Sequence, residues 1–391
     1  MSSMDFFGKL LDGVTVEWKP LGEVTSIKTG QSVNKQMISA NPGEYPVINS
    51  GREPLGFIDE WNTDNDPIGI TSRGAGVGSV TWQPGKYFRG NLNYSVTIKN
   101  IQLVSTRYLY HLLLEMQPEI QSLCTYDGIP ALNAGNLKEL LVPIPCPDNP
   151  KKSLEIQGEI VRILDAFTSL TAELTAELTA RKKQYNHYRD QLLRFDDSEV
   201  EWKTLGEVCR FINGRAYKQP ELLASGKYPV LRVGNFFTNA NWYYSDLELE
   251  ADKYCDTDDL LYAWSASFGP KIWDGNKVIY HYHIWKVIPN DNLILKKYLY
   301  YVLAWDTEAL KAEHGTGSTM MHVGKGAIEK RLVPVPSLAE QARIVAILDK
   351  FDALTNSITE GLPREIELRQ KQYAYYRDLL LSFPKPDEVE A

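Results

Sequence analysis

Three short motifs in this sequence have residue types that would suit catalysis or cofactor binding. Gly74–Gly78 (GAGVG) has the glycine spacing of a dinucleotide-binding loop. The residues that follow it predict a strand, however, and not the helix whose N-terminus would hold a phosphate. Asp148–Pro150 lacks the second proline and the aromatic residue of an adenine-methyltransferase motif. His281 and His283 would share one face of a strand, as zinc ligands do, but no third ligand is evident.

The pattern GxxxxGK[ST] of a nucleotide-binding loop does not occur, so no ATP site is evident. The sequence therefore shows no convincing active site. We interpret Gly74–Gly78 as a tight turn or as a loop whose backbone approaches DNA. For His281 and His283, a role in the core or at a DNA-facing surface is a better interpretation than metal binding.

The elements that would position such residues occur twice, because the chain is a tandem duplication. The repeated blocks keep their order, so one unit follows another of the same construction, and a doubled chain can fold about a pseudo-two-fold axis. The recurring blocks are VEWKPLGEV (Val16–Val24) and VEWKTLGEV (Val200–Val208), IVRILDAF (Ile160–Phe167) and IVAILDKF (Ile344–Phe351), and RKKQYNHYRDQLLRF and RQKQYAYYRDLLLSF, which end at Phe195 and Phe383.

Residues 1–150 and 196–336 have a similar composition, which is rich in aromatic residues, Gly, Pro, Asn and short β-branched runs. Runs such as GSVTW and YSVTI in the first and YPVLRV in the second alternate apolar and polar residues between turn signals. This pattern predicts strands, with a few helices such as Tyr108–Met116. Each segment is therefore predicted to be a globular α+β domain.

Residues 151–195 and 337–391 are helical regions. Apolar residues step by three and four from Ile160 to Leu178 and from Ile344 to Ile358, which is the a/d seam of a coiled coil. Gly361-Leu362-Pro363 is predicted to end one helix and open the next. The first region instead repeats TAEL within Thr171–Leu178, which is a stutter in the heptad pattern.

These helices are either a hairpin between the domains or a rigid spacer that also docks a partner. They carry more aromatic surface than a two-helix hairpin needs. The candidate partner-binding residues on them are Tyr185, Tyr188, Tyr373 and Tyr376.

Composition narrows the function classes. The net charge is −8, whereas proteins that coat DNA are usually basic, so any affinity for nucleic acid must come from local patches or from a partner. No apolar run reaches the ~18 residues of a membrane span. The first residues, MSSMDFFGKLLDG, do not read as a signal peptide. The four cysteines lie far apart, which predicts a reducing, cytoplasmic setting.

Together these motifs resemble the specificity (S) subunit of type I restriction-modification enzymes, over essentially the whole chain. One signal is a WKxLGEV opening that leads to Gly30 in the first repeat and Gly214 in the second. Another is the pair SRGAGVGSV and SASFGPKIW, each of which precedes a strand. The third is a VPxP exit into a helix bearing Gln, Ile-Val and Leu-Asp, at Gln157–Asp165 and Gln341–Asp349.

The resemblance implies an α+β fold with two globular target-recognition domains, separated by two long antiparallel coiled-coil helices, in a pseudo-two-fold tandem duplication. Each domain would read half of a bipartite site in double-stranded DNA. The helical regions would bind two modification (methyltransferase) subunits, which restriction/translocase subunits join. The chain itself would be non-catalytic, with S-adenosylmethionine, ATP and Mg²⁺ in the partner subunits. Residues 1–15 would be the tail of a helical region, in a circular arrangement.

Three alternatives remain at this point. The chain could be an autonomous DNA-binding regulator of such a complex, or an enzyme with methylation or nuclease activity of its own. It could also be a purely structural coiled-coil scaffold, although the two loop-rich aromatic domains argue against that.

Residue types indicate which side chains would contact DNA. Arg and Lys suit guanine, Asn and Gln suit adenine, and Ser, Thr and Tyr often hold phosphates. In the first domain the candidates are Lys28, Gln31, Arg73, Asn91, Asn93 and Tyr94. In the second they are Asn213, Arg215, Tyr217, Lys218, Arg232, Asn235, Ser267, Lys271 and Ser318. The two sets differ in chemistry although the flanking scaffold repeats, as two domains reading different half-sites would show.

Overall fold

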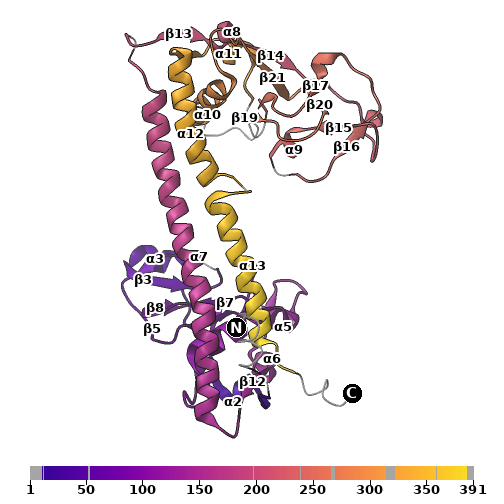
Figure 1. Ribbon diagram of the computed structural model, residues 1–391. Helices are drawn as coiled ribbons and strands as arrows, with labels where there is room; N and C mark the ends of the chain where they lie inside the picture. Colours follow the sequence, from indigo (N-terminus) through magenta and orange to yellow (C-terminus); the bar gives the residue numbers. More distant parts are fainter. Residues whose placement is uncertain are drawn as a thin grey trace. The chain divides into compact units, whose positions relative to one another are not determined.

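The structure is a computed structural model that describes residues 11, 13–51, 53–196, 198–237, 239–265, 269–313, 322–357 and 359–384. It divides into two compact units, shown in Figure 1. The first unit comprises residues 1–174 and 365–391, and the second comprises residues 175–364. Each unit therefore combines the globular part of one repeat with a helical segment from the other repeat. The helical tail predicted at residues 1–15 falls mostly outside the described residues.

The first unit is built mainly from short strands. Its elements before the long helix are β1 (Val16–Pro20), α2 (Leu21–Val24), β2 (Thr25–Thr29), α3 (Lys35–Ala40), β3 (Pro42–Ile48), β4 (Phe57–Ile58), β5 (Thr63–Asp64), β6 (Ile68–Thr71), β7 (Val80–Trp82), β8 (Lys86–Arg89), β9 (Asn93–Ile98), α4 (Thr106–Glu115), α5 (Gln117–Ser122), β10 (Cys124–Thr125), β11 (Ala131–Leu132), α6 (Ala134–Glu139) and β12 (Leu141–Pro145). The helix predicted at Tyr108–Met116 is confirmed as α4.

Two four-stranded sheets form the centre of this unit, in the orders β2-β9-β6-β7 and β4-β3-β8-β5. All the pairings are antiparallel except β3 with β8. A separate antiparallel ribbon joins β1 to β12 and so brings the start and end of the globular part together.

The second unit repeats this plan. Its globular elements are β13 (Glu201–Thr204), α8 (Leu205–Val208), β14 (Cys209–Asn213), η1 (Gln219–Glu221), β15 (Tyr228–Leu231), α9 (Val233–Phe237), β16 (Tyr243–Ser245), η2 (Ala251–Lys253), β17 (Tyr254–Cys255), β18 (Leu260–Ala263), β19 (Gly269–Ile272), β20 (Val278–Tyr280), β21 (Ile284–Pro289), α10 (Lys296–Glu313), α11 (Lys325–Ile328) and β22 (Leu332–Val335).

The sheet orders of the second unit are β14-β21-β18-β19 and β16-β15-β20-β17, with a β13-β22 ribbon. As in the first unit, the one parallel pairing within the second sheet joins its two central strands, here β15 and β20. The sequence duplication is thus a duplication of topology.

Three helices make up the helical regions. The long helix α7 (Pro150–Leu193) contributes its first part to the first unit and its last part to the second. The second region is divided into α12 (Leu338–Thr355) and α13 (Gly361–Leu381), so an interruption occurs as predicted, but α12 already ends at Thr355 and Gly361 opens α13 instead of ending the first helix. Gly361 has a positive φ of 73°, and a Cβ there would collide with the carbonyl oxygen of Ala353, so only glycine fits this break.

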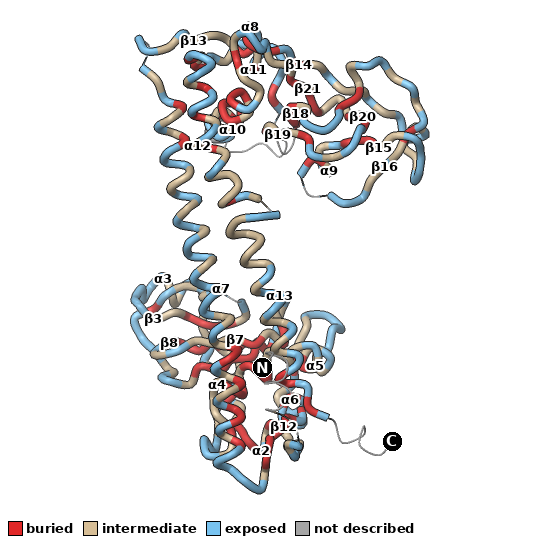
Figure 2. The backbone as a smooth tube through the Cα atoms, viewed as in Figure 1, coloured by how far each residue is buried: buried red, intermediate tan, exposed pale blue. Residues whose placement is uncertain are grey.

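Burial follows the globular parts, as Figure 2 shows in red. In the first unit the main core joins sheet residues such as Ile70 to α4 and to the α7 residues Ile160 and Leu164. Leu380 and Leu381 of α13 complete this core, although they belong to the other repeat. Between Asp165 and Tyr188, α7 has no buried residue, although half-buried Phe167 packs against the first core and half-buried Tyr185 against the core of the second unit.

Candidate nucleic-acid interface

In each unit the chain passes from one central sheet to the other through a short turn, which we call the crossing turn. It is Gly90–Leu92, between β8 and β9, in the first unit and His281–His283, between β20 and β21, in the second. An isolated parallel bridge joins Gln31 to Gly90, and an equivalent bridge joins Arg215 to His281. The crossing turns therefore occupy the same place in both units.

A glycine makes this close approach possible in both units. A Cβ at Gly30 would collide with the carbonyl oxygen of Gly90, and a Cβ at Gly214 would collide with that of Tyr280. The next residue then donates its backbone N–H across the gap, from Gln31 to Arg89 over 2.9 Å and from Arg215 to Tyr280 over 3.0 Å. The WKxLGEV opening and its following glycine thus bring a polar side chain beside each crossing turn.

In the first unit, several loops meet at the crossing turn. The backbone N–H of Ser72 donates to the Leu92 carbonyl over 2.9 Å, and the Leu92 N–H donates to the Asn49 side chain, also over 2.9 Å. The predicted contacts Gln31 and Arg73 are exposed, and Asn91 is half-buried. This cluster could present amide and guanidinium groups to base edges.

Lys28 is exposed on β2 and borders a cavity of about 360 Å³ together with Gln31 and Arg89. The Gly74–Gly78 loop closes tightly, since Val77 N–H donates to the Gly74 carbonyl over 3.0 Å, and it leads into β7. It is a turn between strands, as one of the two interpretations expected.

The prediction that Asn93 contacts DNA is wrong for this structure. Asn93 is fully buried as the first residue of β9, and its Oδ1 accepts a hydrogen bond of 2.6 Å from Arg89 Nη1. Tyr94 is half-buried and donates its hydroxyl to the Leu132 carbonyl over 3.1 Å. Both side chains therefore hold the unit together internally.

Arg89 is the centre of this polar core. Its guanidinium donates to the carbonyls of Ile68 and Tyr94, over 3.2 and 3.1 Å, and to the carbonyl of Asp66 over 2.7 Å. Only 3% of the residue is exposed, and this burial lowers its pKa. The arginine therefore ties strands from both sheets together from the inside.

In the second unit, the crossing turn carries three rings, His281, Tyr282 and His283. Tyr217 stacks against His281 with 6.3 Å between ring centroids, and exposed Arg232 is close enough to affect the His281 charge. Burial, His283 and Arg232 together lower the pKa of His281 to about 4. This imidazole is therefore uncharged at neutral pH.

Arg215 is held by an acidic neighbour. Its guanidinium makes a bidentate ion pair with Glu221, over 3.0 and 2.8 Å. Hydrogen bonds from Arg215 and from the Lys218 backbone lower the pKa of Glu221 to about 2. Arg215 is thus oriented beside the crossing turn by a carboxylate that stays ionised.

The remaining predicted contacts of the second unit are dispersed. Asn213 and Lys218 are exposed, and in the chain they lie on either side of Arg215, which bridges to the crossing turn. Asn235 donates its amide to the carbonyls of Asn239 and Asn241, over 3.0 and 2.8 Å, and so stabilises its own loop. Lys271 pairs with Asp274 and borders a different cavity, beside α10 and α12. Ser267 and Ser318 lie outside the described residues.

The four tyrosines proposed for partner binding all pack within their own units. Tyr376 stacks on Phe167 at 5.2 Å, and Tyr188 stacks on Phe351 at 5.6 Å, so the two repeats make the same contact. Tyr185 also packs on Phe351, and the Tyr373 hydroxyl lies 3.5 Å from His111 Nδ1. Their role toward a partner stays a prediction.

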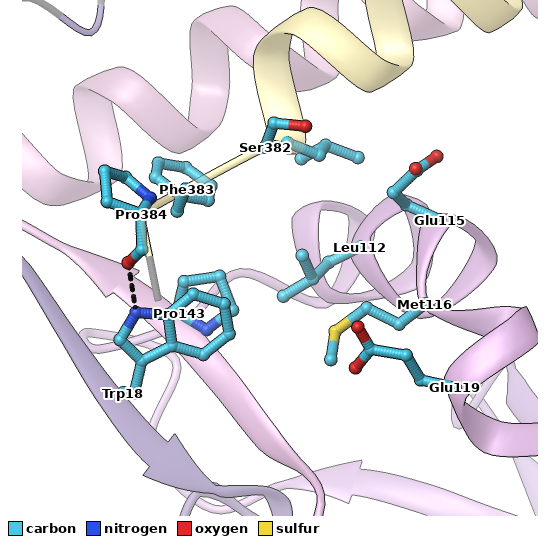
Figure 3. Close-up of a pocket in the computed structure, with 10 residues that line it drawn as sticks. Trp18, Leu112, Glu115, Met116, Glu119, Pro143, Ser382, Phe383 and Pro384 are labelled. Carbon is cyan, nitrogen blue, oxygen red and sulfur yellow. Dashed lines mark hydrogen bonds between the residues drawn. The ribbon is translucent and has the colours of Figure 1, made fainter. Parts of the chain in front are cut away.

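A second cavity of the first unit, of about 510 Å³, forms where the end of α13 meets the β1-β12 ribbon (Figure 3). Trp18 Nε1 donates to the Pro384 carbonyl over 2.8 Å, and Glu115 of α4 pairs with Arg377 of α13. Burial raises the pKa of Glu115. These contacts hold the tail of the second repeat on the globular part of the first.

Sequence reasoning did not single out the second unit's Trp264 and His322, or Tyr282, as contact residues. His281 and His283 were considered first for metal binding. The signal was nevertheless present, because NLNYSVTI in the first repeat and VIYHYHIW in the second mark the same strand and its preceding turn. Among the described residues, no group of three or more His, Cys, Asp or Glu side chains could hold a metal ion. In the same part of the chain, no helix is both long and apolar enough to cross a membrane.

Comparison with known proteins gives consistent matches. The family model for the type I restriction modification DNA specificity domain matches twice, at residues 14–181 and 197–368. The chain is 37% identical to the type I restriction enzyme EcoR124I/EcoR124II specificity subunit of Escherichia coli, with 100% of both chains covered. It is 33% identical to a putative type I restriction enzyme specificity subunit of Haemophilus influenzae, over 97% of this chain and 98% of that one.

Solved structures share the fold. The S subunit of a type I restriction-modification system from M. genitalium matches with a TM-score of 0.63 at 19% identity, covering 96% of this chain and 98% of that chain. A chain from a study of complex assembly and conformational transition of the type I system matches with a TM-score of 0.59 at 14% identity, covering 94% and 97%.

Proposed function

The chain belongs to the family of type I restriction-modification DNA specificity subunits, and we propose that it selects the DNA sequence on which such an enzyme acts. Each compact unit would read one half of a bipartite site in double-stranded DNA. The observation that carries this proposal is the pair of crossing turns. They lie at equivalent positions in two units with the same strand order, yet their residues differ: Gly90–Leu92 in the first unit and His281–His283 in the second.

Two reading units with different surface chemistry suit a target with two different halves. Direct readout depends on which donors and acceptors reach the base edges, and the scaffold around them carries no sequence information. Gln31, Arg73 and Asn91 would serve one half-site. Arg215 and the rings of the second crossing turn would serve the other, with Arg232 on the DNA backbone.

The partners follow from the family. A specificity subunit works within a restriction-modification assembly, and we propose that two methyltransferase subunits bind along the helical regions, with restriction/translocase subunits joining them. In this proposal α7 pairs antiparallel with the second helical region as a coiled coil that spaces the two reading domains. Tyr375, with 51% of its surface exposed, is available to such a partner.

Catalysis would then belong to the partners. The relatives are named as specificity subunits, and we propose that S-adenosylmethionine, ATP and Mg²⁺ act in the methyltransferase and restriction subunits, in the cytoplasm. Methylation or nuclease activity by this chain alone is the less favoured alternative. Binding of S-adenosylmethionine to the purified chain, measured by calorimetry, would favour that alternative.

The direct test is to express the chain with its methyltransferase partner in a host that lacks such a system, and to map methylated adenines across the genome. We expect one bipartite motif, with two short specific halves and a nonspecific spacer. Methylation without a motif, or a motif that persists when this chain is omitted, would contradict the proposal.

A second test concerns the charge of the chain. At a net charge of −8, the isolated chain neutralises few phosphates, whereas phosphate contacts supply much of DNA affinity. We expect weak binding of the motif by the chain alone, and tight binding only with two methyltransferase subunits. Nanomolar, sequence-specific binding by the isolated chain at physiological salt would refute this partner dependence.

A further inference from the structure

We propose that the half-buried rings of the second crossing turn, with Trp264 and His322 beside them, are the base-contacting surface of the second unit. They would recognise bases by stacking and by hydrogen bonds of neutral rings, while Arg232 and Lys218 hold the DNA backbone. The inference rests on the proposed function, because it names the residues through which one unit reads its half-site.

The crossing turn is rigid enough to read a sequence. Arg215 N–H donates to the Tyr280 carbonyl over 3.0 Å, and Tyr282 N–H donates back to the Arg215 carbonyl over 3.0 Å. His281 N–H donates to the carbonyl of Leu231, the last residue of β15, over 2.9 Å, which ties the turn to a strand as well. Side chains on a backbone fixed from several directions lose little freedom on binding, which favours specificity.

Trp264 fixes the turn from the opposite side. Its backbone N–H donates to the His283 carbonyl over 3.0 Å, and its indole Nε1 donates to the Tyr282 carbonyl over 2.8 Å. The Val323 N–H in turn donates to the Trp264 carbonyl over 3.1 Å, which holds neighbouring His322 in place. The turn therefore has bonded neighbours on both flanks.

The rings form one continuous surface. Tyr282 and His283 are 3.9 Å apart between centroids, and His281 lies 4.8 Å from His283. Trp264 adds a ring 5.0 Å from His283, and exposed His322 continues the surface 5.9 Å from Trp264. Aromatic faces stack on bases, and Tyr hydroxyl and imidazole nitrogens can hydrogen-bond to base edges.

Charge is placed around these rings rather than on them. Burial lowers the pKa of both His281 and His283, so the turn itself carries no positive charge at neutral pH. Exposed Arg232, which contributes to lowering the pKa of His281, supplies a cation beside the turn, and Lys218 is a second exposed cation, three residues after Arg215 in the chain. This separation matches the division of labour in DNA recognition, in which cations neutralise phosphates and neutral groups discriminate bases.

The first unit provides the matched case. The same backbone positions there hold Gly90, Asn91 and Leu92, so the equivalent turn offers one amide in place of three rings. If the fold itself required aromatic rings in the crossing turn, both units would have them, because their strand orders are the same. The difference is therefore better explained by what each turn contacts.

The test uses the chain assembled with its methyltransferase partner, and as probe a duplex carrying the bipartite motif found by methylation mapping. The double variant Tyr282→Ala/His283→Ala is compared with wild type and with Asn91→Ala in the first unit. We expect the double variant to lose about 10- to 100-fold in affinity for the motif and to accept changes in one half-site only. Asn91→Ala should relax the other half-site.

Salt dependence separates the proposed roles. Arg232→Ala should weaken binding of all sequences and make the slope of log K against log salt shallower by about 1, whereas the double ring variant should leave that slope unchanged. An unchanged motif and affinity in the double variant would overturn the inference. Equal relaxation of both half-sites at a wild-type melting temperature would also overturn it, because it would indicate a role in assembly.

If the double variant melts below wild type, His283→Gln, which keeps a polar side chain, takes its place. A changed half-site in this variant supports the inference, and an unchanged half-site contradicts it. Failure of the proposed function is distinguishable, because then the wild-type assembly itself would show no bipartite motif.

Discussion

The two compact units have the same topology but different interiors, and the position shared by Arg89 and Tyr280 shows this best. Both residues end the strand before the crossing turn. Arg89 Nη2 donates to the Asp66 carbonyl over 2.7 Å, and Tyr280 donates its hydroxyl to the Asp252 carbonyl over 2.6 Å. A side-chain hydrogen bond to a loop carbonyl is thus donated by the buried guanidinium of Arg89 in one unit and by the phenol of Tyr280 in the other.

The comparison separates what the fold requires from what it leaves free. Both units close their globular part with the same backbone hydrogen bond, from Leu21 to Leu140 over 2.7 Å and from Leu205 to Arg331 over 2.9 Å. Both need a glycine where the loop meets the crossing turn. The residues of the turn itself differ entirely. The fold therefore requires the closing hydrogen bonds and the glycines, whereas the residues of the crossing turn can change without loss of the fold.

The largest expected effect is the loss of the buried arginine. Arg89→Met should destabilise the first unit by about 3–5 kcal/mol, because it removes a buried guanidinium that donates to the carbonyls of Ile68 and Tyr94 and to the Asn93 side chain. The matched change in the second unit, Tyr280→Phe, should cost only about 1 kcal/mol, because it removes a neutral hydroxyl with one short hydrogen bond to Asp252 and one long one, of 3.4 Å, to Ile212. Urea unfolding of the two variants measures both, and equal costs would contradict the contrast.

A smaller effect is expected where the units are alike. Phe167 and Phe351 make equivalent stacked contacts with Tyr376 and Tyr188. Replacing either phenylalanine with alanine should cost about 1–2 kcal/mol, because each is half-buried and loses one aromatic pair. Thermal unfolding tests this symmetry. A neutral effect at one position with a large effect at the other would show that the helical contacts are not equivalent.

A pH-dependent effect should distinguish the second unit. The folded pKa of His281 is lowered to about 4, so the unfolded chain binds more protons than the folded chain between that pH and its ordinary value near 6.5. This histidine therefore contributes stability that is fully present above pH ~6.5 and is lost as the pH falls toward 4. Over this range wild type should lose more stability than His281→Asn, as urea titrations at several pH values would show. Parallel losses would rule the linkage out.

The smallest effect on stability should accompany a change in the helix that runs through both units. One further TAEL after Thr171–Leu178 lengthens α7 by about 6 Å and turns its far end by a net 40° or so. One base pair advances about 3.4 Å and turns about 34–36°. We expect the nonspecific spacer to lengthen by one base pair, two at most, with both half-sites unchanged. An unchanged spacer in an active enzyme, seen by methylation mapping, would show that α7 does not set this distance.

Much of the architecture could be predicted from the sequence because its signals are local and occur twice. Apolar residues spaced three and four apart predicted the helices α7 and α12, and Gly361 indicated the break between α12 and α13. The strand order could not be predicted, since the parallel pairing of β3 with β8 joins segments far apart in the chain.

The site shows the same limit on a finer scale. Asn91 and Asn93 are two residues apart and identical in type, yet one lies in the turn and the other is fully buried as the first residue of β9. Only the pairing of that strand decides which asparagine lies in the turn and which is buried. Arg89 was not singled out either, because the residue type gives no sign that an arginine will be buried.

The central claim is that each unit reads one half-site by itself, and a chain with two copies of one reading unit tests it most directly. Residues 21–140 would replace residues 205–331, at the hydrogen bonds that close both globular parts. The grafted residues would find an equivalent carboxylate on the helix that they pack against. In the second unit, Lys297 and Tyr301 hydrogen-bond to Asp349 of α12. In the first unit, Arg107 and His111 hydrogen-bond in the same way to Asp165 of α7.

Methylation mapping of cells that carry this chain with its methyltransferase partner is the decisive measurement. The account predicts a motif in which both specific halves have the sequence now read by the first unit. A motif that keeps the original second half-site would contradict it, because reading would then reside outside the grafted residues.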